Sequence, residues 1–346
     1  MKKLSFALLA AALFVFGAGS ASAEKYELNF QSIYAPGHAV QKGVFAPWVE
    51  EVSAKHPDLK ITLFASGAIL ESKELADGLK NGMVDFTMPN LTFDAKQYPA
   101  AFLGNLPMLY DNSKMGTAFA YKLVAGVPEY ADAIKKCGHL ISIWAPGTGA
   151  FFSVKTPVYT PADLAGKRVL VMVPSDVEPI KALGAVPVIV NPGDIYVGLQ
   201  RGMGEICWTA WPMAGGLRLD EVCKYATNCA YASAVLQLCM SHMDVDNLPK
   251  DVVKVIEDSA GTALSDRISD ALTADVENVK ARFKAAGAEV IDLTPEQLAA
   301  FREKATQLVE NYWIPFLEKN GLKNAKELVA KVYEISDANR AEFNAK

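Results

Sequence analysis

The sequence is poor in the residues that carry catalysis and metal binding. It contains four histidines in 346 residues, and no two of them have the spacing of a zinc ligand set. Cysteines never occur as C-x-x-C, and the G-x-S-x-G and H-E-x-x-H patterns of hydrolases are absent. We therefore expect a protein that is not an enzyme and that uses no metal ion and no cofactor.

Basic clusters and long apolar runs are also lacking. Lys and Arg number 34 against 39 Asp and Glu, and no tract of basic residues occurs, which argues against nucleic acid and anionic lipid as partners. Beyond residue 23 no stretch of 18 apolar residues predicts a membrane-spanning helix. With 51% hydrophobic and 21% charged residues the chain has a globular composition. Its length favours two lobes, and we expect a monomer.

The first 23 residues have the pattern of a secretory signal peptide. Lys2 and Lys3 precede the apolar run of residues 6–17, and the small residues 21–23 provide a cleavage site. The apolar run is too short for a permanent membrane helix, although a retained anchor is the alternative. The absence of a cysteine at the cleavage point argues against a lipoprotein. We expect the mature protein in the periplasm.

The cysteines are the unusual feature of an exported chain. There are five of them, Cys137, Cys207, Cys223, Cys229 and Cys239. An odd number leaves at least one thiol unpaired within the chain, and the pairing cannot be deduced from spacing. We expect one disulfide among the last four; the alternative is that all five stay reduced.

The order of expected strands and helices indicates two α/β lobes. Alternation and helical spacing predict, in chain order, strand 27–33, helix 40–55, strand 60–65, helix 71–81 and strand 84–88. A second run has strands 140–144, 168–173 and 186–190 and helices 177–183 and 195–202. Strands that alternate with helices form largely parallel sheets, whose ligand sites lie at the carboxyl ends of the strands.

Long helical patterns fill the C-terminal part of the chain. They cover residues 250–286, 295–319 and 325–343, and Pro315 should kink or end the middle one. No internal repeat stands out. We expect a first lobe and a second lobe, linked by a hinge, with the ligand cleft between them. Their expected extents are residues 24–146 with about 232–275, and residues 147–231 with about 276–346.

Three motifs between residues 163 and 205 carry a family resemblance. They are D-L-A-G-K-R from Asp163, L-G-A-V-P-V from Leu183 and I-Y-V-G-L-Q-R-G from Ile195. In this order they resemble the motifs of the periplasmic solute-binding proteins of TRAP transporters, the DctP family. Two first-lobe segments, F-A-S-G-A-I from Phe64 and L-P-M-L-Y-D from Leu106, resemble the same family.

The resemblance implies a fold and a function. The fold is the two-lobed periplasmic binding protein fold, α/β in class, with long C-terminal helices. The two lobes would close on a small organic anion, and the closed complex would dock on the small and large integral membrane subunits of a TRAP transporter. Closure strips water from the solute and so strengthens each polar contact. A sensor that reports to a signalling receptor is the alternative output.

Two positions depart from the family pattern, because both lack an expected arginine. The arginine that forks onto a ligand carboxylate would fall at Leu170, or at Met172 if the alignment is anchored on Pro174, and a second one would fall at Gly149. Strand parity puts Arg168 on the face of Leu170 about 7 Å away, so it could supply the charge. The alternative is that Arg168 is a solvated edge residue.

Without those arginines, other groups must hold the solute. Backbone N–H groups, hydroxyls and aromatic N–H groups suit a sulfonate, so we expect a short sulfonate such as isethionate or a C2–C4 organic acid. A flat, mainly apolar aromatic acid is the alternative, and Trp208 and Trp211 would then form its wall unless they pack in the core. The expected ligand-binding residues are Tyr34, His38, Glu71, Asn90, Phe93, Trp144, Phe151, Arg168, Leu170, Asn191, Trp208 and Trp211.

Overall fold

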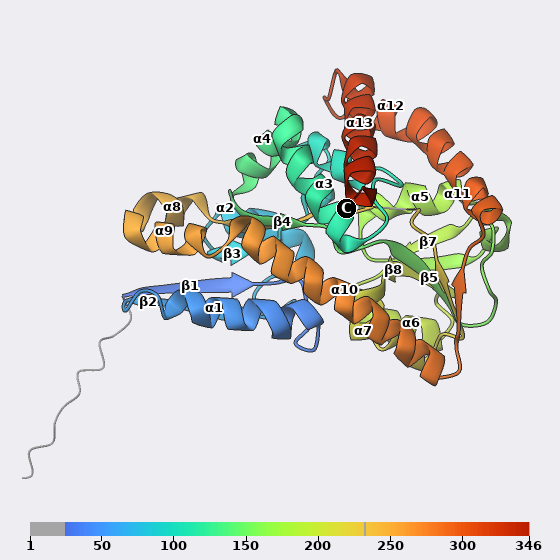
Figure 1. The fold of residues 1–346 in the computed structure, drawn as a ribbon, viewed down its shortest axis with the longest axis horizontal. Coiled ribbons are helices and arrows are strands. Elements are labelled where there is room, and N and C mark those ends of the chain that lie inside the picture. The colour runs from blue at the N-terminus through green and yellow to red at the C-terminus, as the bar shows by residue number, and fades with distance from the viewer. Residues whose placement is uncertain (1–24, 232, 346) are drawn as a thin grey trace, which may run out of the picture.

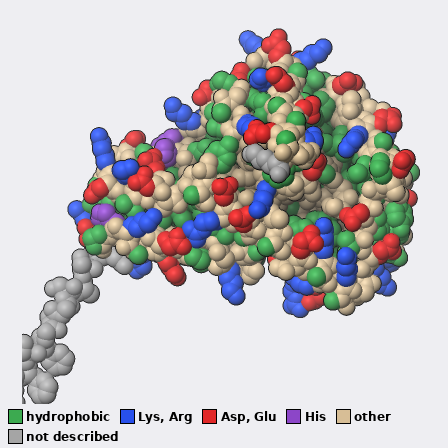
Figure 2. Space-filling view, viewed as in Figure 1, with side chains coloured by type: hydrophobic (Ala, Val, Ile, Leu, Met, Phe, Trp, Pro, Cys, Tyr) green, Lys and Arg blue, Asp and Glu red, His purple; other side chains and the backbone are tan. Residues whose placement is uncertain are grey.

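The computed structural model describes residues 25–231 and 233–345, which form two α/β lobes joined by long helices (Figure 1). The expected signal peptide lies outside the described residues. Within them, no helix is both long and apolar enough to span a membrane. On the face drawn in Figure 2, acidic and basic side chains are interspersed.

The first lobe is built on a five-stranded sheet in the order β2-β1-β3-β10-β4. Its strands are β1 (Tyr26–Gln31), β2 (Leu59–Phe64), β3 (Phe86–Thr87), β4 (His139–Trp144) and β10 (Leu236–Met240). β1 is parallel to β2 and β3, whereas β10 is antiparallel to β3 and β4. The strand between β3 and β4 in space therefore comes from a distant part of the chain.

The second lobe has a six-stranded sheet in the order β11-β9-β5-β8-β6-β7. Its strands are β5 (Gly149–Ser153), β6 (Arg168–Val171), β7 (Val186–Ile189), β8 (Ile206–Ala210), β9 (Tyr225–Asn228) and β11 (Glu289–Asp292). β6 is parallel to β7 and β8, and β5 is antiparallel to β8 and β9. In both sheets the strands of the βαβ units are parallel, and other strands pair with them antiparallel. The alternating sequence pattern predicts only the parallel part.

Helices cover both sheets. The shorter ones are α1 (Ala46–Ser53), α2 (Leu75–Lys80), α3 (Ser113–Gly126), α4 (Pro128–Cys137), α5 (Val177–Ala182), α6 (Ile195–Gln200), α7 (Trp211–Gly216) and α8 (His242–Asn247). Short 3-10 turns precede several of them, including residues Ser72–Glu74 before α2 and Pro192–Asp194 before α6. These two turns begin their helices at the space between the lobes.

One expected long helix is in fact two, α9 (Lys250–Asp258) and α10 (Gly261–Ala285). The break falls at Gly261, whose φ of 60° is a left-handed conformation that glycine adopts without strain. α10 then runs diagonally across both lobes (Figure 1), packing on β4 and α3 in the first and on α7 and β11 in the second.

The C-terminal helices are α11 (Pro295–Leu308), α12 (Ile314–Lys319) and α13 (Ala325–Asn344). A π-helical turn, Val309–Trp313, joins α11 to α12 just before Pro315, so the helix deforms at the proline and continues past it. α13 packs on α3 of the first lobe, although it belongs to the stretch expected in the second lobe. Its apolar face, including Val329 and Val332, completes the first-lobe core.

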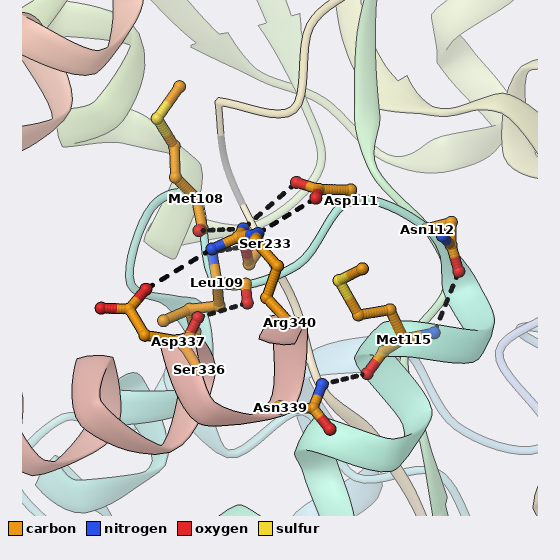
Figure 3. Close-up of polar contacts among 10 residues, drawn as sticks. All are labelled: Met108, Leu109, Asp111, Asn112, Met115, Ser233, Ser336, Asp337, Asn339 and Arg340. Carbon is orange, nitrogen blue, oxygen red and sulfur yellow. Dashed lines mark hydrogen bonds and ion pairs between the residues drawn. The ribbon is translucent and has the colours of Figure 1, made fainter. Parts of the chain in front are cut away.

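Polar contacts at the end of α13 attach it to the segment before α3 (Figure 3). Arg340 donates through Nε and Nη2 to the two carboxylate oxygens of Asp111, at 3.0 and 3.1 Å, and through Nη2 to the carbonyl of Met108. Ser336 donates to the carbonyl of Leu109 at 2.6 Å. The Leu109 N–H in turn donates to Ser233 Oγ, in the segment that crosses back from the second lobe.

All five cysteines are buried free thiols, so the expected disulfide is absent from the structure. Each is packed as a small apolar side chain in one of the hydrophobic cores. Burial raises the pKa of the Cys223 and Cys229 thiols to about 12, which keeps them protonated and unreactive.

Candidate ligand cleft

A cleft of about 470 Å³ lies between the two lobes. The first lobe contributes the segments that follow β1 and β3 and the start of the turn before α2. The second lobe contributes the ends of β6, β7 and β8, and the crossing segment 233–237 closes one side. The cleft therefore lies at the carboxyl ends of parallel strands in both sheets, as the sequence analysis expects.

His38 and Tyr34 form a stacked pair on the first-lobe wall, with ring centroids 3.9 Å apart and planes 7° apart. Nδ1 of His38 accepts the Val40 N–H at 3.2 Å, which places the proton of the neutral ring on Nε2. Burial lowers the pKa of His38 to about 4 and also raises that of Tyr34. This wall thus presents a neutral imidazole donor at neutral pH, with no cation.

Trp208 forms the opposite, second-lobe wall. It lies on β8 opposite Phe151 of β5, and the two ring centroids are 4.6 Å apart. The indole also covers Gly149, where an added Cβ would overlap the ring. A glycine at 149 is therefore required by the indole, and no side chain, arginine included, fits there while Trp208 keeps this position.

Side-chain amides and a hydroxyl supply most of the polar lining. Asn90 Oδ1 is occupied by the N–H and hydroxyl of Thr92, which leaves its amide NH₂ available. Gln237 donates to the Pro89 carbonyl at 2.7 Å, which leaves its Oε1 available as an acceptor. Asn105, Asn191 and Thr209 also line the cleft. Such groups hydrogen-bond a polar solute without requiring a particular charge.

The charged groups of the lining are few: Glu71, Lys73 and Asp176. Glu71 and Lys73 are exposed at the first-lobe rim, whereas Asp176 is partly buried on the second-lobe side. Desolvation raises the pKa of Asp176 to about 7. No arginine lies among the described residues that line the cleft.

Seven of the twelve expected ligand-binding residues lie together in this cleft. They are Tyr34, His38, Glu71, Asn90, Phe93, Asn191 and Trp208. They come from both lobes, and their location at strand ends and helix starts is the signal that selects them in the sequence. Their contact with a solute remains a prediction.

Four expected residues are in the core instead. Trp144 is fully buried in the first-lobe core, and Phe151 lies behind the Trp208 indole. Leu170 fills the space against Gly198 and Gly204 in the second-lobe core. Trp211 packs edge-on against Phe152 in the same core. In each case the side chain faces the interior, and for Trp211 this is the core-packing alternative stated above.

Arg168 is outside the cleft as well. It is the first residue of β6, and β6 runs toward the cleft, so Arg168 lies at the far end of the strand. Its Nη2 donates to the Gly202 carbonyl at 2.8 Å, just after the end of α6, where carbonyl groups lack helical partners. Arg168 is two residues from Leu170 along β6, as expected, but it lies at the end of the strand that is farther from the cleft. The residues after β6 that line the cleft are Met172, Val173 and Asp176.

Several lining residues were missed by the sequence analysis. Asp176 ends the turn after β6, and the rule that sites lie at the carboxyl ends of parallel strands would have found it. Met172, the first residue after β6, was named from the sequence only as the alternative position of the missing arginine. Ser233 and Gln237 have no comparable signal, because they lie in the segment that returns to the first sheet as an antiparallel strand. Asn105 is the last residue of the 3-10 segment Pro99–Asn105, and no sequence motif marks it as a lining residue.

Two α/β lobes that enclose a mainly apolar cleft at their strand ends define a two-lobed solute-binding protein. The chain belongs to the family described as bacterial extracellular solute-binding protein, family 7, also called DctP, whose model matches residues 30–315. The resemblance inferred from the motifs and the expected fold class are both confirmed. Members of this family bind solutes for transport and are not enzymes.

Named relatives cover nearly the whole chain. The ectoine/5-hydroxyectoine-binding periplasmic protein UehA of Ruegeria pomeroyi is 25% identical over 94% of this chain and 96% of its own length. A TRAP solute-binding protein of Rhodoferax ferrireducens, solved with copurified benzoate, superposes with a TM-score of 0.81 at 18% identity, covering 91% and 98% of the two chains. The ectoine-binding protein of the TeaABC TRAP transporter of Halomonas elongata has a TM-score of 0.79 at 21% identity, covering 90% and 99%.

Proposed function

We propose that this protein is the periplasmic solute-binding component of a TRAP transporter and that it captures a flat organic acid with an apolar body. The cleft carries the proposal, because its walls are an indole and a stacked Tyr34–His38 pair. Aromatic walls favour a flat solute through apolar burial and ring stacking. Relatives that bind ectoine and benzoate are consistent with a ring-shaped solute.

The acid group would be held without an arginine fork. Lys73 at the rim and the amide N–H groups of Asn90, Asn105 and Asn191 are the donors that the cleft offers. His38 adds a neutral N–H donor from Nε2. A solute that contacts both lobes selects the closed form, in which it is shielded from water and presented to the two integral membrane subunits.

A thermal-shift panel tests the solute class. Benzoate, phenylacetate and mandelate should raise the melting temperature, whereas isethionate and succinate at equal concentration should raise it less. A ligand at 100 times its Kd stabilises a protein by about 2.7 kcal/mol, which gives a shift of several degrees. Stabilisation by isethionate alone would instead favour the short sulfonate. Stabilisation by none of these acids would contradict the proposed function.

Uptake tests the transport role. Deletion of the gene should abolish energy-dependent uptake of the acid that the panel identifies, and the same strain should recover uptake when the gene is restored. Intact uptake with altered transcription would show that the protein serves a sensor. Small-angle scattering with and without the acid should show a smaller radius of gyration in the bound form.

A further inference from the structure

One carboxylate in the cleft has no partner. Asp176 lies after β6, in the 3-10 turn Pro174–Asp176, and lines the cleft from the second lobe. That turn packs against the 3-10 turn Leu91–Phe93 of the first lobe, so Asp176 is at the seam where the two lobes meet. Within residues 25–231 and 233–345, no hydrogen bond or ion pair involves its carboxylate oxygens.

A structural role does not account for this side chain. Asp176 is the N-cap residue of α5, but its carboxylate caps no backbone N–H there. Glu71, the other cleft carboxylate, differs, because it forms a capping box with Glu74 in the turn before α2. The acid of the first lobe thus stabilises its own turn, whereas the acid of the second lobe makes no such hydrogen bond within the described residues.

In the part of the chain that the structure describes, no Lys or Arg forms an ion pair with Asp176. Lys181 of α5 pairs with Glu178, and Arg168 is turned away to the Gly202 carbonyl. The turn Leu91–Phe93 opposite carries no charged side chain. Burying a carboxylate without a partner costs free energy, and a positive charge placed beside it recovers that free energy. The raised pKa of Asp176, about 7, reflects the same uncompensated burial.

We infer that Asp176 is a specificity-determining residue that binds a protonated amino group of the solute. The inference rests on the proposed function and narrows it: the solute is an organic acid that also carries an ammonium or amidinium group. Its acid end has Lys73 and the amides available at the first-lobe side, and its cationic end meets Asp176 on the second lobe. Such a zwitterion bridges the lobes with opposite charges, and this arrangement needs no arginine in the cleft.

Calorimetry at pH 8 on matched pairs of acids tests the inference. The pairs differ by an ammonium group: phenylacetate and phenylglycine, 4-methylbenzoate and 4-(aminomethyl)benzoate, butyrate and 4-aminobutyrate. In at least one pair the ammonium-bearing acid should bind tenfold or more tightly than its partner. Asp176→Asn should remove that preference and leave the affinity for the ammonium-free acid within about threefold, less than 1 kcal/mol.

Asp194→Asn is the matched control. Like Asp176, Asp194 is the last residue of a proline-led 3-10 turn and the N-cap residue of a six-residue helix, and it makes no side-chain cap. It is not among the residues that line the cleft. This variant should bind both members of each pair as the unchanged protein does. Equal losses in the two variants would show a general effect of removing an acid and would overturn the inference.

The wild-type protein gives an independent measurement if Asp176→Asn fails to fold. Affinity for the ammonium-bearing acid should rise between pH 6 and pH 8 as Asp176 loses its proton, while His38 stays neutral throughout. Glu71, Lys73, Tyr34 and Tyr130 are the other titratable groups of the lining. Affinity that falls over this range would mean that a protonated Asp176 donates to the solute anion, and would overturn the inference.

The outcomes separate this inference from the proposed function. If ammonium-free acids bind as tightly as their partners, the solute-binding role stands and Asp176 is not its specificity residue. If no acid of either kind binds, the proposed solute class fails and the inference fails with it. A preference for the ammonium group that survives in Asp176→Asn also overturns the role of Asp176.

Discussion

At the scale of single residues, Trp208 and Gly149 depend on each other across the β5–β8 pair. Gly149 leaves room for the indole, and the indole forms the wall that a flat solute would contact. In the sequence alone, the absence of a side chain at 149 indicates a missing charge. The structure gives it a different meaning, because the position is sterically committed to the aromatic wall.

Replacing Trp208 by alanine should weaken binding of an aromatic acid by about tenfold or more, since about 1.4 kcal/mol of ring contact and apolar burial is lost. Trp208→Phe keeps a flat wall and should retain most of the affinity. Both are measured by isothermal titration with the acid found in the thermal-shift panel. Equal affinity of Trp208→Ala and the unchanged protein would show that the indole is only packing.

His38 should make the protein less stable in mild acid. Its pKa is about 4 in the folded protein and about 6.5 when exposed, so the unfolded chain binds the extra proton between these values. Stability is therefore complete above pH 6.5 and falls by about 3 kcal/mol as the pH approaches 4. In His38→Asn, urea unfolding at pH 4.5 and 7 should show a smaller difference. An unchanged difference would contradict the buried neutral imidazole.

Residue-level sequence rules succeeded where position along a strand decided the outcome and failed where tertiary packing decided it. Strand-end location selected Asn90 and Asn191 correctly as lining residues. The sequence predicted both Trp208 and Trp211 as walls of the cleft. Trp208 does line it, but the chain turns into α7 at Trp211 and places that side chain in the core. Only the packed structure distinguishes them.

At the scale of elements, the two lobes use the same local unit at the cleft. Residues 69–83 and 189–203 each contain a 3-10 turn, a six-residue helix and a Gly-Met ending, although no repeat is evident in a first inspection of the sequence. Met83 and Met203 both donate backbone N–H bonds of 2.8 Å to the glycine five residues earlier. Gly82 and Gly202 have φ values of 67° and 73°, which is the Schellman ending of a helix. Both units begin at the cleft and end on the outer surface.

α13 supports the cleft wall indirectly, through the loop that Arg340 holds. Arg340→Ala removes a two-bond contact to Asp111 that is partly exposed, and should cost about 1 kcal/mol of stability. Urea unfolding of Arg340→Ala, Asp111→Ala and the double variant gives the coupling between them. Additive losses in this cycle would mean that the two side chains do not stabilise each other.

At the scale of the whole molecule, one hydrophobic core extends through both lobes. It joins Leu79 and Phe119 of the first lobe to Val169 and Trp208 of the second, and it includes Val332 of α13. The lobe boundaries expected from sequence follow the change of sheet, but sequence gives no sign that the C-terminal helices return to the first lobe. That docking depends on contacts whose partners are more than 200 residues away, such as the hydrogen bonds of Ser336 and Asn339.

Because the core is shared, the lobes should unfold together. Ile143→Val in β4 and Ile206→Val in β8 each remove one buried methylene from this core, at a cost of about 1 kcal/mol. Each variant should shift one common urea midpoint, observed equally by tryptophan fluorescence and far-ultraviolet circular dichroism, with an unchanged slope. Two separate transitions, each shifted by only one of the variants, would mean that the lobes unfold independently. In that case α10, which packs on both lobes, would link them without making them one cooperative unit, and solute binding would stabilise each lobe to a different extent.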